Sequence, residues 1–413
     1  MSNAGRSNHA DRDGRHRVSA NSGDDANPTS ARVATILDPL SPGTRAQVHA
    51  APVLVNRILT GPGSSKQTRH VELSLEGTGI SYQPGDALGV IVRNDASVVS
   101  ALLKALGLKE DEHVEVGGEK LTLAEALTAR FECTTANARF LEHWARLSGA
   151  VALASLEGSA AAGERAGFLA THHVIDIVRS FPVSGITPAD LIGGLKPLQP
   201  RYFSIASSQA AAGGNAHLLV ATVEYTMHGE ARRGVASGHF IDRAPVGGTL
   251  PVFLHANPHF RLPAGDAPII MIGAGTGVAP YRAFLQQRAL SGAASAAWLF
   301  YGDRNAQTDF AYREDWQGFI DHGALSRMDV AFSRDGVAKT YITEKLVEHA
   351  TELRRWIDDG AHVYVCGDAA RFAPSVHYAL VRVLAGADGR DIDAAEQRLQ
   401  LLKRQNRYQL DVY

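Results

Sequence analysis

The stretch MIGAGTGVAP, residues 271–280, decides how the second half of the chain folds. An apolar run enters three closely spaced glycines, and a helix-forming segment follows at once. Glycines at such a turn let a phosphate approach the backbone, and the N-terminus of the next helix offers free N–H groups. The spacing departs from the common G-x-G-x-x-G pattern, and tight packing alone also produces such turns. By itself the stretch favours nucleotide binding and simple packing about equally.

On both sides of this turn, strand-like and helix-like segments alternate after Pro263. A helix-like segment covers Tyr281–Leu290. The alternation predicts a parallel sheet with crossover helices, and hence an α/β domain over residues 263–413. The predicted strands are Ile269–Ile272, Trp298–Tyr301, Met328–Phe332 and His362–Cys366.

The chain before Pro263 has a different rhythm. Short alternating runs predict β-strands, and a Gln-Pro-Gly-Asp turn at 83–86 precedes one of them. Residues 97–195 instead place apolar side chains at helical spacing. We therefore predict a β domain formed by residues 51–96 and 196–262, with a helical insertion at 97–195. The predicted strands are Val53–Thr60, His70–Leu75, Leu88–Val92, Tyr202–Ala206 and His217–Tyr225.

Composition excludes several classes of protein. The 41 Lys and Arg nearly balance the 43 Asp and Glu, so no global charge attracts nucleic acid or anionic lipid. Only two cysteines, Cys133 and Cys366, occur, which excludes a disulfide framework and indicates a reducing compartment. We expect a cytoplasmic protein with no membrane span, no signal peptide and no bound metal. Residues 1–50 are polar and predict a disordered tail and linker.

A cluster of phosphate-binding side chain types follows the predicted strand at 328–332. Ser333 and Arg334 lie directly after it, and Lys339 and Tyr341 follow closely. A hydroxyl, a guanidinium, an ammonium and a phenol together could bind a dianionic phosphate, and the 2′-phosphate of NADP is the candidate at this edge of a parallel sheet. The alternative is a solvated basic loop, which the stretch alone favours.

Three further motifs are ambiguous when taken singly. RYFSIASS at 201–208, with GVAS at 234–237, could hold a pyrophosphate and face a flavin, or form an ordinary strand. YVCGD at 364–368 ends a strand in a thiol, and a lone buried cysteine is usually a small hydrophobe. Chain ends usually fray, but the tyrosines of RYQLDVY at 407–413 suggest that this end docks.

In this order the motifs resemble those of the ferredoxin-NADP reductase superfamily. The similarity is greatest to the FAD/NADPH half of the diflavin flavoprotein subunits of NADPH-dependent sulfite reductases, and it includes SYQPGDALGV at 81–90. It covers about residues 50–413, and the order and spacing of the motifs make chance agreement very unlikely. The resemblance implies a β-barrel FAD domain with a helical insertion, followed by an α/β parallel-sheet NADP-binding domain.

The resemblance also implies roles for individual residues. Ser204, Cys366 and Asp411 would be catalytic, around the path of a hydride from nicotinamide to flavin. The implied FAD contacts are Arg201, Tyr202, Phe203, Ser204, Leu219, Ala221, Tyr225, Gly234, Val235, Ala236, Ser237 and Tyr413. The implied NADP contacts are Gly275, Thr276, Ser333, Arg334, Lys339, Tyr341 and Thr343.

Three departures from the family pattern stand out. Phe203 replaces a usual tyrosine, and Ser375 replaces a usual acidic residue. The family's flavodoxin-like N-terminal domain, of about 150 residues, does not fit into the polar residues 1–50. We therefore expect FAD and NADPH as cofactors, but no FMN.

An enzyme of this kind needs an external electron acceptor. The resemblance implies a separate haemoprotein, such as the sulfite reductase component, or a flavodoxin-like carrier or a ferredoxin. One alternative is a ferredoxin- or flavodoxin-NADP reductase working in the opposite direction. Another is a partner subunit that binds FAD without turnover, and the intact set of Ser204, Cys366 and Asp411 argues against it.

Overall fold

The computed structural model describes residues 47–293, 295–386 and 391–413. Most of the predicted tail at residues 1–50 lies outside the described residues. The first strand, β1 (His49–Ile58), begins within the last two residues of that predicted tail and linker. No helix in the described ranges is long and apolar enough to cross a membrane.

The first part of the described chain forms a closed antiparallel barrel. Its six strands run in the order β6-β3-β10-β1-β2-β7, and every neighbouring pair is antiparallel. The two end strands meet at a bridge between Ile205 and Leu218, and Ala206 N donates to His217 O at 2.7 Å. The other strands are β2 (Thr68–Leu73), β3 (Ala87–Val90), β6 (Arg201–Ser204), β7 (Ala216–Ala221) and β10 (Thr249–His255).

The insertion between β3 and β6 is mainly helical, as predicted. Its helices begin at recognisable caps: Asp95 accepts from Ser97 N, and Thr122 forms a capping box with Glu125. A short hairpin, which the sequence analysis missed, lies among them. The elements are α1 (Ala96–Leu106), β4 (His113–Val116), β5 (Glu119–Thr122), α2 (Leu123–Ala129), α3 (Ala138–Ser148), α4 (Val151–Ala154), α5 (Ala162–Thr171), α6 (Val174–Ser180) and α7 (Pro188–Gly194).

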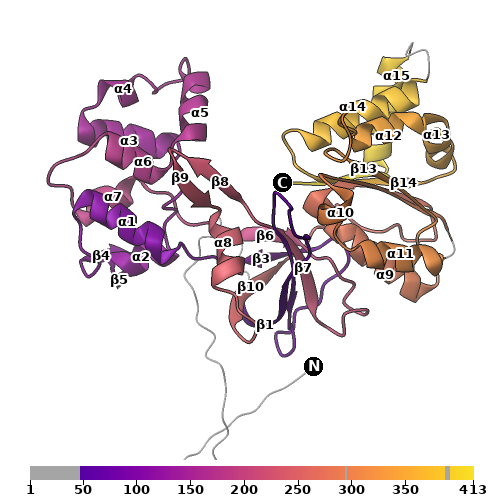
Figure 1. Cartoon of the computed structure of the whole chain (residues 1–413), viewed down its shortest axis with the longest axis horizontal. Helices are drawn as coiled ribbons and strands as arrows, with labels where there is room; N and C mark the ends of the chain where they lie inside the picture. The colour runs from indigo at the N-terminus through magenta and orange to yellow at the C-terminus, as the bar shows by residue number, and fades with distance from the viewer. Residues whose placement is uncertain (1–46, 294, 387–390) are drawn as a thin grey trace, which may run out of the picture. The chain divides into compact units, whose positions relative to one another are not determined.

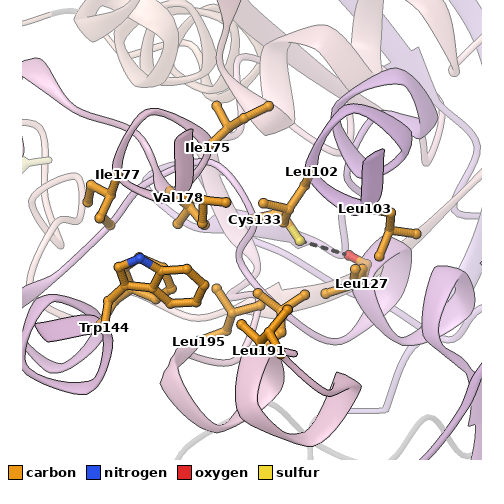
Figure 2. Packing of buried hydrophobic residues seen from close by; sticks show 14 of the residues in the cluster. Leu102, Leu103, Leu127, Cys133, Trp144, Ile175, Ile177, Val178, Leu191 and Leu195 are labelled. Atoms are coloured by element: carbon orange, nitrogen blue, oxygen red, sulfur yellow. Dashed lines mark hydrogen bonds between the residues drawn. The ribbon is translucent and has the colours of Figure 1, made fainter. Parts of the chain in front are cut away.

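The insertion has its own hydrophobic core. Side chains from α1, α2, α3, α6 and α7 form one cluster that includes Trp144 (Figure 2). Trp144 is fully buried and donates its indole N–H to Phe181 O at 2.8 Å. The Cys133 thiol lies in the same core and donates to Leu127 O at 3.5 Å. Burial raises the pKa of this thiol, so Cys133 is an inert packing residue.

The predicted strand at residues 217–225 is divided between two strands in the structure. We expected a strand over His217–Tyr225, but β7 ends at Ala221 and the chain enters a hairpin of β8 (Glu224–Met227) and β9 (Glu230–Arg233). Ion pairs tie this hairpin to the insertion: Arg232 bonds Asp176 at 2.7 Å, and Arg179 bonds Glu230 at 2.7 Å. The helix α8 (Val235–Asp242) follows directly.

The last part of the described chain is an α/β layer structure. Five parallel strands run in the order β13-β12-β11-β14-β15, with one core on each face of the sheet. α9 and α11 cover one face and α12–α15 the other (Figure 1). The elements are β11 (Ile269–Ala274), the 3₁₀ turn η1 (Gly275–Val278), α9 (Ala279–Ser291), β12 (Ala297–Asp303), α10 (Ala306–Asp309), α11 (Arg313–Asp321), β13 (Arg327–Phe332), α12 (Ile342–Glu348), α13 (Ala350–Asp358), β14 (His362–Gly367), α14 (Phe372–Ala385), α15 (Ile392–Arg404) and β15 (Tyr408–Val412).

The predicted fold class is confirmed: an antiparallel barrel with a helical insertion, followed by a five-stranded parallel sheet with helices. The fold also sets where chemistry can occur. In a parallel sheet of this type, ligands bind at the carboxyl ends of the strands. β15 adds the end of the chain to that edge, beside β14.

Candidate active site

Three side chains predicted to be catalytic meet at the carboxyl edge of the parallel sheet. Cys366 on β14 lies directly opposite Asp411 on β15. Ser204, at the end of barrel strand β6, donates its hydroxyl to Asp411 Oδ2 at 2.8 Å. Cys366 Sγ lies 3.5 Å from the same oxygen. Residues far apart in sequence and from two folded parts therefore converge on one carboxylate.

The thiol of Cys366 is held in its neutral form. The side chain is fully buried, and this burial together with the nearby Asp411 carboxylate raises its pKa well above the ordinary value. A neutral buried thiol is a poor nucleophile. Cys366 is therefore a small neutral side chain at this site, with a weak S–H donor.

The final residue is docked at the same edge. Tyr413 N donates to Gly367 O at 3.2 Å, and Ala369 N donates to Tyr413 O at 2.9 Å. Its hydroxyl lies 2.7 Å from the Thr276 hydroxyl in η1. The residue as a whole is nevertheless 63% exposed. The main chain of Tyr413 is thus fixed at this edge, while part of the residue remains accessible.

The geometry of the glycine turn is compatible with both close packing and nucleotide binding. A Cβ on Gly277 would lie 2.1 Å from the Cys366 carbonyl oxygen, so this glycine permits close packing of the turn on β14. Gly275 has φ of +56°, and a Cβ there would meet only Lys66 Nζ, at 3.8 Å. Gly277 is therefore explained by packing, while Gly275 leaves its backbone open for a ligand.

A barrel loop reaches the predicted phosphate site. The Ser65 hydroxyl accepts from Arg304 at 3.0 Å and from the predicted phosphate ligand Arg334 at 2.9 Å. Within the described part of the chain, the side-chain partner of both guanidinium groups is this hydroxyl, and neither forms an ion pair with a carboxylate. The neighbouring Lys66 differs, since it pairs with Asp303 at 2.6 Å. Ser65, Lys66 and Arg304 carried no motif that sequence analysis could detect.

The other predicted NADP residues lie further along the same edge. Ser333 Oγ donates to Asp303 O at 3.3 Å, next to Arg334. Lys339 and Tyr341 are exposed, and Tyr341 precedes α12 as its N-cap. Thr343 lines a separate surface hollow of about 350 Å³ that also contains Ser375. Within the described residues, no hydrogen bond joins Lys339, Tyr341 or Thr343 to Arg334.

Gly234, from the predicted pyrophosphate set, lines a cavity of about 320 Å³ at the N-terminus of α8. Gly234 is the N-cap, and no side chain caps this helix end. Arg232 also lines the cavity, and its buried Nε lacks a hydrogen-bond partner within the described residues. Free N–H groups and an unpaired guanidinium donor are what a phosphate oxygen requires. Val235 lines the cavity as well, whereas Ser237 Oγ braces the turn by accepting from Val223 N at 3.1 Å.

The predicted FAD contact Tyr225 lines a different hollow, which shares His173 with the cavity at α8. Tyr225 is 38% exposed, and its hydroxyl lies 2.5 Å from His173 Nε2. Burial of the imidazole, with Arg232 nearby, lowers the pKa of His173, so this ring is neutral near pH 7. The contact with His173 therefore fixes the position of the Tyr225 hydroxyl.

The residues predicted on β6 and β7 occupy different environments. Arg201 bonds Glu132 of the insertion at 3.2 Å, and Phe203 packs edge-on against Phe240. Tyr202 packs instead against His255, with ring centroids 4.5 Å apart. On β7 and α8 the remaining predicted residues are partly or fully covered: Leu219 is buried, and Ala221 and Ala236 are half-buried.

A second polar cluster joins the barrel to the α/β part. His70 Nε2 lies 2.8 Å from Glu72 Oε1, and His217 Nε2 lies 3.7 Å from the other oxygen. The three ligand atoms are close enough for a metal ion. Arg282 N–H, however, faces His217 Nδ1 at 3.3 Å, which leaves the proton on Nε2, towards Glu72. Burial, reinforced by Arg282, lowers the pKa of His217 to about 4. The cluster is best described as a hydrogen-bond network.

Comparisons with known proteins agree with this geometry. Residues 41–158 and 152–239 match the FAD binding domain family, and residues 271–377 match the oxidoreductase NAD-binding domain family. The chain is 45% identical over 374 residues to the sulfite reductase [NADPH] flavoprotein alpha-component of Salmonella paratyphi B, covering 90% of this chain and 62% of that protein. For the corresponding protein of Shigella boydii the identity is 43% over 400 residues, covering 94% and 66%. The chain thus spans a little under two thirds of the relatives it matches.

Proposed function

The chain belongs to the oxidoreductases that join an FAD binding domain to an NAD-binding domain, as sulfite reductase [NADPH] flavoprotein alpha-components do, and on this premise we propose that it is an FAD-dependent NADPH reductase. The observation that carries the proposal is that Ser204 and Cys366 both face the same carboxylate oxygen, Oδ2 of Asp411. A subunit that only bound FAD would have no need of this arrangement. In the proposal the insertion occupies residues 97–195, between the barrel segments 51–96 and 196–262, and the NADP domain is residues 263–413.

The residues at the site fit the two nucleotides. Gly234, Val235, Ala236 and Ser237, with Arg201, Tyr202, Phe203, Leu219, Ala221 and Tyr225, would hold FAD, and Gly275, Thr276, Ser333, Arg334, Lys339, Tyr341 and Thr343 would hold NADPH. The open N-terminus of α8 and the unpaired Arg232 Nε support the first assignment. The two guanidinium groups that share the Ser65 hydroxyl support the second.

The chemistry follows from the groups in place. FAD, when bound, supplies the capacity to accept a hydride from nicotinamide. The Ser204 hydroxyl donates to Asp411, and this hydrogen bond fixes the orientation of the hydroxyl beside the proposed hydride path. The Asp411 carboxylate stabilises the positive charge that arises on the nicotinamide side. The small neutral side chain of Cys366 lets a planar ring approach closely.

The electron acceptor in this proposal is a separate protein. The names of the relatives favour the haemoprotein component of a sulfite reductase, and a flavodoxin-like carrier or a ferredoxin is the alternative. We propose the cytoplasm as the compartment, because both cysteines are unpaired and buried.

Anaerobic stopped-flow mixing tests the proposed activity. NADPH is expected to bleach the visible absorbance of the bound flavin at a rate at least as high as that of steady-state turnover. The matched variant Asp411→Asn keeps the size of the side chain but removes its charge, and it should bleach at least about tenfold more slowly. A wild-type flavin that stays oxidised in excess NADPH would favour the non-catalytic alternative.

The flavin content is a second expected outcome. We predict that the 413-residue chain binds one FAD and no FMN, because one pyrophosphate cavity, at α8, has the helix end and the cation that a flavin dinucleotide needs. Acid release of the flavin followed by chromatography measures both cofactors. Stoichiometric FMN in the released fraction would contradict the prediction.

A further inference from the structure

The two oxygens of the Asp411 carboxylate have different partners. Oδ2 faces Ser204 and Cys366, which are the residues of the proposed hydride path. Oδ1 accepts from the side-chain amide of Asn257 at 3.3 Å. A carboxylate held from one side only could rotate about its last bond and exchange its oxygens. Asn257 is placed to prevent that rotation.

Asn257 is itself fixed by a buried carboxylate. Its main-chain N–H donates to Asp86 Oδ1 at 2.8 Å, and Asp86 is only 3% exposed. Asp86 also accepts from the Arg261 guanidinium, and its carbonyl accepts from Ile205 N at 2.9 Å. Ile205 directly follows Ser204. One aspartate therefore sets the positions of both the Asn257 loop and the strand that carries Ser204.

The other end of the Asn257 loop is attached to β15, the strand of Asp411. Arg261 N donates to Gln409 Oε1 at 2.7 Å, and Tyr364 on β14 donates its hydroxyl to Arg261 O at 2.7 Å. The turn at Gly85 approaches so closely that a Cβ there would lie 1.9 Å from Phe260 O. The segment 257–261, which links the barrel to the parallel sheet, is thus held from both sides.

We propose that Asn257 is a positioning residue for hydride transfer, whose amide holds Asp411 with Oδ2 towards Ser204 and Cys366. The inference rests on the proposed function. A neutral amide suits this task, because it orients the carboxylate without neutralising the charge that the nicotinamide side requires. A lysine or arginine at the same place would form an ion pair and compete with that role.

The test compares three variants of the flavin-loaded protein. Asn257→Ala removes the amide, Asn257→Asp replaces it with a second carboxylate, and His259→Ala alters an exposed residue of the same loop as a control. We expect Asn257→Ala to slow flavin reduction by NADPH about 10- to 100-fold, with the apparent Kd for NADPH changed less than about twofold. His259→Ala should match the wild type in both measurements. A wild-type rate in Asn257→Ala would overturn the proposal.

The pH dependence of the thermal midpoint gives a readout that does not depend on turnover. Two carboxylates this close raise the pKa of the pair in the folded state above the unfolded value of about 3.9. A carboxyl group whose pKa is raised in the folded state loses its stabilising contribution as the pH rises from the unfolded pKa through the folded pKa. The midpoint of Asn257→Asp should therefore fall below that of Asn257→Ala between about pH 4 and pH 7, by about 2–4 °C.

The rate of flavin reduction and the thermal midpoint test the role of Asn257 separately from the proposed reductase function. If the wild type is not reduced by NADPH, the proposed function fails, while the comparison of midpoints still measures whether residue 257 faces Asp411. If the wild type is reduced, and the midpoint curves of the two variants superimpose, the contact does not exist and the proposal is wrong.

Discussion

Arg334→Ala is expected to lower kcat/KM for NADPH by about 10- to 150-fold and to leave kcat/KM for NADH nearly unchanged. A charge-assisted hydrogen bond to phosphate contributes about 1.5–3 kcal/mol, and about 1.4 kcal/mol corresponds to a factor of ten. The structure holds this guanidinium against the Ser65 hydroxyl, with no carboxylate to neutralise it in the described ranges. NADH lacks the 2′-phosphate, so it loses nothing when Arg334 is removed. Steady-state kinetics with both nucleotides measure the two ratios.

Ser65→Ala is the matched control for this prediction. Arg334 contacts Ser65 across the junction of the barrel and the parallel sheet, so its removal also deletes that contact. If the contact only supported the fold, each of the variants Ser65→Ala and Arg334→Ala would lower kcat/KM for NADPH and for NADH by the same factor. Equal losses with NADPH and NADH in Arg334→Ala would show that the arginine has a structural role.

The fold could be predicted because its signals are local. The alternation of strands and helices after Pro263 and the glycine turn at 273–277 need no distant contact to be interpreted. The β4–β5 hairpin was also within reach of prediction. Gly117 and Gly118 both have positive φ, as two-residue hairpin turns require, and alternating residues flank them. It was missed because the helical periodicity of the surrounding insertion dominated the interpretation.

The site residues that were missed could not have been predicted from local sequence signals. Ser65 and Lys66 lie in a Gly- and Ser-rich loop of the barrel, more than 230 positions before their partners Asp303 and Arg334. Asn257 lies in an irregular link, with no motif around it. Their roles arise only when the barrel and the parallel sheet meet. Ser204 and Asp411 are just as distant, and only the resemblance to a family connected them in advance.

Tyr413→Ala is expected to raise kcat/KM for NADH by about 2- to 12-fold and so to narrow the discrimination between the nucleotides. Tyr413 as a whole residue is exposed, while its main chain is bonded to Gly367 and Ala369. In the proposed function this ring covers the flavin, and any nicotinamide must displace it. Aromatic stacking contributes about 0.5–1.5 kcal/mol, which gives the expected range. NADPH overcomes the same barrier through its remote 2′-phosphate contacts, which NADH lacks.

Tyr413→Phe separates the ring from its hydroxyl. The hydroxyl lies 2.7 Å from Thr276 Oγ1, so a docking role that depended on this hydrogen bond would make the two variants behave alike. If the ring is the barrier, Tyr413→Phe should keep the wild-type ratio of NADH to NADPH efficiency, and only Tyr413→Ala should change it. The alanine variant should also turn over NADPH more slowly, because oxidised nicotinamide would stay on the uncovered flavin. An unchanged ratio in Tyr413→Ala would mean that the last residue anchors the chain end and does not gate the site.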